Sequence, residues 1–228
     1  GTLDPLAEGV LVLCVGPATR LADVVQAGRK VYVTTARLGE TSTTDDAEGE
    51  IKPVIGAAPV KAEAMGAALN GMVGRVEQRP PAYSAVKIDG QRAYKRARRG
   101  EAVAPAPRPV TIHELALQDY DWPEATIRIV CGSGTYVRSV VRDLGEALGV
   151  GGYCKGIVRL AVGRFTIKDA AALELFESEP VESLLIPAIE AFPLEDRVTV
   201  GPGEISELIH GRAAPAPAAD LPSGRPLP

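Results

Sequence analysis

The chain has 228 residues, of which 46% are apolar and 24% are charged, and these values are ordinary for a globular protein. They exclude a disordered chain, a collagen-like repeat and a coiled coil. Aromatic residues make up only 4% of the chain, so the core must depend on aliphatic side chains. Each tyrosine therefore has a raised chance of serving through its ring or its hydroxyl.

The net charge of −4 is unevenly distributed along the chain. Residues 75–108 contain nine Lys and Arg residues against three acids, whereas residues 169–196 contain eight acids and no basic residue. A concentrated basic stretch can bind a polyanion even when the whole protein is acidic. On charge alone, a solvated helix face explains the stretch equally well.

The sequence carries no sign of membrane insertion or metal binding. No apolar run approaches the ~20 residues that a membrane span requires, and no basic segment marks a signal peptide at the start. The chain does not begin with Met, so we expect that further residues of the gene product precede it. Three widely separated cysteines argue against a disulfide framework, and two isolated histidines give little support for a metal site. We expect a reduced, cytoplasmic, metal-free protein.

The first half of the chain predicts short elements of both kinds. β-Branched residues predict a strand over residues 30–38, and an acidic loop follows over residues 40–50. Apolar positions at helical spacing predict a helix over residues 60–71. Residues 91–99 predict a short basic helix, and three prolines within residues 105–109 predict an extended connector.

The second half begins with a half-buried strand over residues 126–131, followed by a tight turn in which Thr135 is a candidate N-cap. A helix then places one apolar stripe toward the core, with Gly149 as its C-cap. The stripe consists of Val137, Val140, Val141, Leu144 and Leu148. Residues 157–167 predict another strand. The predicted strands and helices do not alternate regularly as in βαβ units, so they predict an α+β fold rather than a doubly wound parallel sheet.

The character of the chain changes after about residue 196. Residues 204–212 predict one short helix, but residues 213–228 hold five prolines in sixteen positions and cannot bury a core. We therefore expect residues 197–228 to be a tail or a fragment of a small domain.

The opening segment GTLDPLAEGVLVLCVGPATRL, residues 1–21, is the most informative. It places Asp4 directly before a proline, where helical backbone is disfavoured, and close to a hydrophobic run. A carboxylate on such a loop fits a nucleophile or a general base. The local sequence fits an Asx-type turn residue as well.

This segment resembles the catalytic signature of the TruB family of pseudouridine synthases, G-T-L-D-P-L-A-x-G-V-L followed by G-x-A-T-[KR]. Four further segments resemble family segments in the same order: KVYVTTARLGETSTTDDAEGEI (30–51), PPAYSAVKIDGQRAYKRARRGE (80–101), GSGTYVRSVVRDLGEALG (132–149) and GGYCKGIVRLAVGRF (151–165). Five segments in the right order make the resemblance specific.

The resemblance implies the pseudouridine synthase fold, a mixed, mainly antiparallel central sheet flanked by helices. It implies a catalytic domain over residues 1–196 and a truncated C-terminal PUA-like fragment, or a tail, over residues 197–228. The implied reaction is an isomerisation: the N1–C1′ bond of uridine breaks, the uracil turns, and C5 joins C1′. No group is imported and nothing is oxidised, so we expect no cofactor. The target base must leave the RNA stack to be reached.

The resemblance also implies roles for four residues. Asp4 is the expected catalytic aspartate, and Arg138 is expected to pair with it and keep it ionised. Tyr32 is expected to stack on the flipped base. Tyr136 is expected beside the reacting uracil and is a candidate for proton transfer at C5.

Two more positions match residues around the family's pocket: Arg20 near it and Leu160 lining it. The third segment, which carries the basic stretch, is expected to bind RNA through phosphate contacts and aromatic stacking. Its candidate residues are Tyr83, Ser84, Lys87, Arg92, Lys95, Arg96, Arg98 and Arg99.

The chain departs from the family pattern in three respects. It begins at the last glycine of a G-H-x-G segment, so we expect that a strand and a histidine that grips RNA precede it. Tyr153 stands where a histidine is common, and Val158 stands where an arginine is frequent. The last two differences alter the expected grip on RNA.

Together these features predict a bacterial-type enzyme that acts on the T-loop uridine at position 55 of tRNA, with no membrane association and no obligate protein partner. One alternative is a dyskerin-type catalytic subunit that depends on a guide RNA. The other is a non-catalytic RNA-binding or RNA-folding module. The long acidic loop favours the stand-alone type, and the intact set of Asp4, Tyr32, Tyr136 and Arg138 argues against lost catalysis.

Overall fold

The computed structural model describes residues 3–84, 86–88, 90–97, 99–101, 103–194 and 197–213, with the backbone alone for residues 87 and 88. By their internal contacts, residues 1–13 with 25–170 form one compact unit, and residues 14–24 with 171–228 form another. The domain boundary expected at residue 196 and the PUA-like character expected of residues 197–228 stay predictions.

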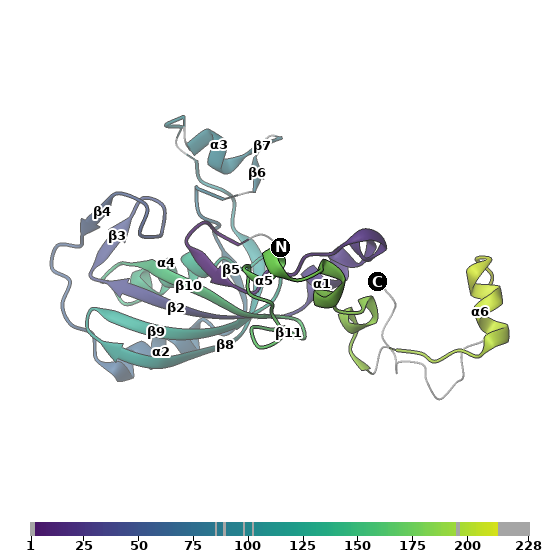
Figure 1. Cartoon of the computed structure of the whole chain (residues 1–228). Coiled ribbons are helices and arrows are strands. Elements are labelled where there is room, and N and C mark those ends of the chain that lie inside the picture. Colours follow the sequence, from purple (N-terminus) through teal and green to yellow (C-terminus); the bar gives the residue numbers. More distant parts are fainter. Residues whose placement is uncertain are drawn as a thin grey trace. The chain divides into compact units, whose positions relative to one another are not determined.

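A seven-stranded sheet forms the first unit (Figure 1). Its order is β1 (Ala7–Gly9), β10 (Gly152–Val162), β2 (Lys30–Leu38), β9 (Glu124–Cys131), β8 (Arg108–Asp121) and β5 (Gly74–Gln78), with β11 (Phe165–Thr166) paired to β10. β1 runs parallel to β10, and the other pairs in this sheet are antiparallel. The predicted α+β class with a mainly antiparallel sheet is confirmed.

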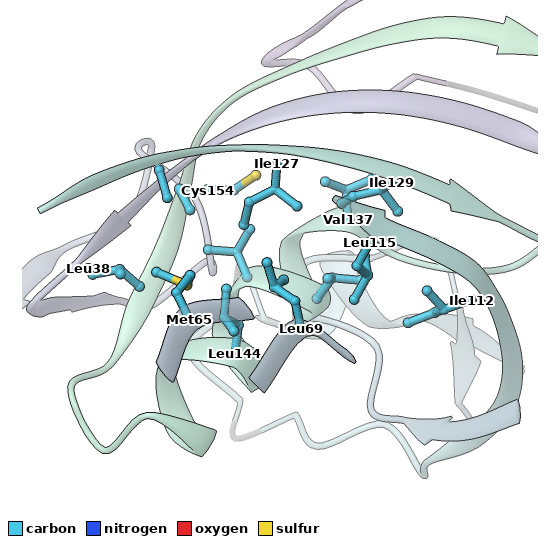
Figure 2. Close-up of a cluster of buried hydrophobic side chains, with 14 of the residues drawn as sticks. Leu38, Met65, Leu69, Ile112, Leu115, Ile127, Ile129, Val137, Leu144 and Cys154 are labelled. Atoms are coloured by element: carbon cyan, nitrogen blue, oxygen red, sulfur yellow. The ribbon is translucent and has the colours of Figure 1, made fainter. Parts of the chain in front are cut away.

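Two helices, α2 (Ala62–Gly71) and α4 (Val137–Ala147), cover one face of this sheet. Alternate residues of β9 turn toward them, because successive side chains of a strand point to opposite faces. Figure 2 shows Met65 and Leu69 from α2 meeting Leu144 from α4 beside Ile127 of β9. Each such buried side chain contributes about 1.5–3 kcal/mol. The predicted stripe of α4 is therefore the inner face of the helix.

The strand over residues 30–38 is confirmed residue for residue by β2, and the helix predicted over 60–71 is α2, which begins two residues later than predicted. The acidic loop begins with β3 (Glu40–Ser42) and is followed directly by β4 (Ile51–Pro53), and the two strands form a small hairpin that the sequence did not indicate. The strand over 157–167 is wrong beyond residue 162, because Gly163 at φ +57° turns the chain back before β11.

The basic helix over 91–99 is shorter than predicted. A hairpin of β6 (Lys87–Ile88) and β7 (Gln91–Arg92) precedes it, and α3 spans only Ala93–Ala97. Gly90 at φ +79° allows the hairpin turn. In Figure 1 these three elements stand out from the sheet as one projection.

Two helix caps and the proline connector also differ from the predictions made from the sequence. Tyr136, rather than Thr135, is the N-cap of α4, and Leu148, rather than Gly149, is its C-cap. Gly149 follows the cap at φ +69°, a conformation that glycine adopts freely. Pro109 lies within β8, paired with Glu77 of β5, so the connector ends at residue 107.

The described residues of the second unit form short elements. They are η1 (Gly16–Leu21), residues 22–24 of α1 (Ala22–Ala27), α5 (Leu175–Ser178), η2 (Val181–Leu184), η3 (Ala188–Ala191) and α6 (Pro202–Ile209). α6 is the helix predicted over 204–212, begun two residues earlier by Pro202 and by the Glu204 carboxylate, which accepts the Gly201 N–H. None of the helices in the described ranges has the length and apolar character needed to cross a membrane.

Candidate active site

A cleft of about 320 Å³ opens in the first unit where β2, β10, the segment before β1 and the turn between β9 and α4 meet. Asp4, Tyr32 and Tyr136, which are 132 positions apart at the extremes, all line it. Its other lining residues are Leu3, Ala7, Gln26, Lys30, Arg108, Gly132, Ser133, Gly134, Thr135, Val137, Ile157 and Arg159. The fold thus brings three of the predicted site residues to one surface.

Arg138, which does not itself line the cleft, fixes the carboxylate of Asp4. Its Nε donates to Asp4 Oδ2 at 2.9 Å, and its side chain is only 4% exposed, against 31% for Asp4. Its Nη1 donates to Asp46 Oδ2 at 2.8 Å and to the Thr44 carbonyl at 3.0 Å, and its Nη2 donates to the Tyr83 carbonyl at 3.1 Å. A guanidinium with four acceptors has one orientation, so this network of hydrogen bonds sets the position of Asp4.

The loop between β3 and β4 supplies the second carboxylate of this network. Arg138 and Arg142 lie one helical turn apart on α4 and both reach this loop, as residues four apart on a helix share a face. Arg142 Nη1 donates to Asp45 Oδ2 at 2.8 Å, and Asp46 is as buried as Arg138, with its side chain 4% exposed. Burial raises the pKa of the Asp45 carboxyl, and Arg142 opposes that rise. The helix and the loop are therefore held together by ion pairs.

Tyr32 and Lys30 from β2 and Arg159 from β10 also line the cleft. Burial raises the pKa of the Tyr32 phenol, while a hydrogen bond with Arg159 opposes the rise, so the ring is neutral at physiological pH. Burial lowers the pKa of the Lys30 ammonium, which donates to the carbonyls of Gln26 and Gly28. Arg159 Nε donates to the Val10 carbonyl at 2.7 Å. A neutral ring on a fixed strand suits stacking on a base.

Gln78, at the end of β5, holds the backbone of Tyr136 on both sides. Its Oε1 accepts the Tyr136 N–H at 2.8 Å, and its Nε2 donates to the Tyr136 carbonyl at 3.2 Å. The Gln78 residue is 2% exposed. The buried Gln78 amide thereby fixes the backbone of Tyr136, the N-cap of α4, whose own side chain makes no capping hydrogen bond.

The predicted RNA-binding residues lie mainly on the projection. Arg96 Nε and Arg99 Nε donate to the two oxygens of Glu101 at 2.7 and 2.8 Å, and these bonds lower the pKa of Glu101. Tyr83 contributes its carbonyl to the Arg138 network. Arg98 and the side chain of Lys87 lie outside the described residues. The basic stretch is thus partly neutralised by its own acid.

Two predicted pocket residues are not among those that line the cleft. Leu160 on β10 is absent from the lining, whereas Ile157 and Arg159 of the same strand belong to it. The strand has an irregularity between Arg159 and Ala161, which spacing alone does not reveal. Arg20 is exposed in η1 and belongs to the second unit, so its role stays a prediction.

Several residues of this arrangement escaped the sequence reasoning: Asp46, Gln78, Arg108, Ile157 and Arg159. For Asp46 the sequence did contain a signal. This residue lies in the segment 30–51 that resembles the family, and a carboxylate in a loop that packs against the protein needs a partner. Gln78 and Arg108 are polar residues at strand ends, and no local pattern separates them from solvated ones.

The fold is that of known pseudouridine synthases. The structure of a Cbf5-Nop10-Gar1 complex contains a chain that superposes with a TM-score of 0.65 at 22% identity, over 92% of this chain and 57% of that one. A chain in the structure of an H/ACA RNP bound to a substrate RNA containing 2′-deoxyuridine superposes with a TM-score of 0.55 at 20% identity, over 86% of this chain and 49% of that one. At these identities the likeness defines the fold class alone.

Sequence comparison then identifies the family. The model described as "TruB family pseudouridylate synthase (N terminal domain)" matches residues 1–137. The tRNA pseudouridine synthase B of Thermobifida fusca (strain YX) is 43% identical over 92% of this chain and 74% of that protein. That of Leifsonia xyli subsp. xyli (strain CTCB07) is 41% identical over 100% of this chain and 77% of that protein. The chain belongs to the TruB family of pseudouridine synthases, which are isomerases acting on RNA.

Proposed function

We propose that this chain converts uridine to pseudouridine in the T loop of tRNA, at position 55. The observation that carries the proposal is the Asp4 carboxylate, held at 2.9 Å by a buried Arg138 in a cleft that Tyr32 and Tyr136 also line. The proteins that are 41–43% identical to this chain are named tRNA pseudouridine synthase B, which supports tRNA as the substrate.

The reaction needs a group that acts on the ribose or the uracil, a surface that holds the free base, and a way to remove the C5 proton. Asp4 supplies the group that acts on the ribose or the uracil. Its Oδ2 is anchored by Arg138, whereas no described residue hydrogen-bonds its Oδ1, which is left for the substrate. Tyr32 supplies a flat neutral surface for the uracil while it turns. Tyr136 supplies a hydroxyl for the proton that leaves C5 once C5 has joined C1′. No atom enters or leaves the nucleoside overall, apart from proton exchange with water.

The positive charge that RNA requires comes from the projection around α3. Arg96 and Arg99 must exchange Glu101 for phosphates when RNA binds, and this exchange makes affinity depend on salt. Cbf5 structures include the proteins Nop10 and Gar1. For this chain we propose action on a bare stem-loop, without a guide RNA or a protein partner.

The test is tritium release from a synthetic T stem-loop whose target uridine alone carries ³H at C5. Joining C5 to C1′ expels that hydrogen, so the purified chain should release tritium with no added component. A stem-loop labelled at a stem uridine serves as the matched control and should release none. If the chain binds the stem-loop but releases no tritium from the target uridine, its function is that of a non-catalytic RNA-binding module. If tritium release requires a guide RNA, the dyskerin-type alternative is supported.

A further inference from the structure

Arg108, at the start of β8, is held in the cleft by two contacts that leave part of its guanidinium unused. Its Nη2 donates to the Gly134 carbonyl at 2.7 Å. Its guanidinium carbon lies 5.0 Å from the centroid of the Tyr136 ring. Neither Nε, which is buried, nor Nη1 donates to an acceptor among the described residues. Nε is closed off from solvent, so Nη1 is the unmatched donor that a ligand in the cleft can reach.

The other cations that line the cleft are committed to the protein itself. The Lys30 ammonium donates to two backbone carbonyls, and Arg159 holds the Val10 carbonyl and the Tyr32 side chain. Asp4, the one carboxylate among the described lining residues, is paired with Arg138. Among the described lining residues, Arg108 thus has a guanidinium nitrogen, Nη1, that donates to no described acceptor.

We propose that Arg108 binds a backbone phosphate of the flipped nucleotide, so that this contact places the uridine against Tyr136 and Asp4. This inference rests on the proposed function, since it concerns how the RNA substrate is held. A guanidinium presents paired N–H donors that match a phosphate, and the stack on Tyr136 fixes its plane before RNA arrives. Little side-chain freedom is then lost on binding. Val137, the first residue of α4, lines the same cleft, so the positive end of the helix dipole adds to the attraction.

The experiment measures the affinity of the full chain for a T stem-loop RNA over a series of KCl concentrations. Arg108→Gln should weaken binding roughly tenfold at low salt and reduce the slope of log K against log[KCl] by ~0.7, the value for one single-stranded phosphate. Arg108→Lys keeps the charge and should keep the slope. Arg128→Gln is the matched control, because Arg128 is paired with Glu114 on the other face of the sheet and should leave the slope unchanged.

A second measurement does not depend on the variant folding. Stem-loops with one neutral methylphosphonate, on the 5′ or the 3′ side of the target uridine, should reproduce the loss of slope at one of the two linkages in the wild-type chain. That linkage should have no further effect in Arg108→Gln. If turnover falls in Arg108→Gln while the slope is unchanged, or if neither linkage matters, Arg108 only positions Tyr136 and the proposal is overturned. Failure of the wild-type chain to release tritium would instead refute the proposed function.

Discussion

The chemistry assigned to this cleft depends on how single residues are held. Arg138 is buried with two carboxylates and two carbonyls, and removing one partner of such a pair costs roughly 3–5 kcal/mol. The resemblance led us to expect Arg138 beside Asp4, and the structure brings the two side chains together. Asp46 lies in a segment that resembles the family, but its partner is 92 positions away, so the pairing is visible only once the loop packs on α4. The catalytic roles of Asp4 and Tyr136 stay predictions.

Tyr136→Phe should separate chemistry from recognition. The ring and its contact with Arg108 remain, so binding of the stem-loop and thermal stability should hardly change. Turnover should fall by ~10²–10⁴ if the hydroxyl moves the C5 proton, since that is the usual effect of a positioned acid or base. Single-turnover tritium release alongside a binding titration checks this. Near-normal turnover would reduce Tyr136 to a packing residue.

Gln78→Met tests whether the clamp on Tyr136 matters for catalysis. Methionine has a similar shape but cannot bond the Tyr136 N–H, so stability should fall by about 1–3 kcal/mol. The single-turnover rate should fall as well, because the backbone of Tyr136 is no longer fixed. RNA affinity should stay within a few-fold of the wild type. A drop in thermal stability with an unchanged rate would assign Gln78 a structural role alone.

Among the elements, those with long periodic patterns were predicted well and those that depend on distant partners were not. The alternating pattern of β2 and the helical spacing of apolar residues in α4 were sufficient to predict these two elements from the sequence. The β6–β7 hairpin has two residues in each strand, and the backbone of Ala93 and Tyr94 is held by the carbonyls of Val86 and Ser84. The hairpin and these bonds take the place of the first turn of the helix predicted over residues 91–99. No periodic pattern in the local sequence indicates them.

The projection around α3 should account for much of the salt dependence of RNA binding. Replacing Arg96 and Arg99 together by Ala should flatten the slope of log K against log[KCl] by up to ~1.4, at ~0.7 per lost phosphate contact. Glu101→Gln should have the opposite effect and tighten binding, because it releases both arginines. A binding titration at several salt concentrations measures both. Slopes equal to that of the wild type would make this helix an ordinary solvated face.

At the scale of the whole molecule, the cleft is a product of topology. Asp4, Tyr32 and Tyr136 come from the segment before β1, from β2 and from the turn before α4, and the strand order β1-β10-β2-β9 gathers them. No spacing rule links residues so far apart, so only the resemblance anticipated their association. The grouping of residues 14–24 with residues 171–228 had no signal in the sequence at all.

The most direct test of the account compares Asp4→Asn with the wild-type chain in tritium release and in binding to the same T stem-loop. The change removes a charge but little volume, and the Asp4 side chain is 31% exposed, so the variant should fold. The account predicts no measurable release, with RNA affinity within about tenfold of the wild type, because phosphate contacts elsewhere supply most of the binding. Substantial release of tritium by Asp4→Asn would contradict it.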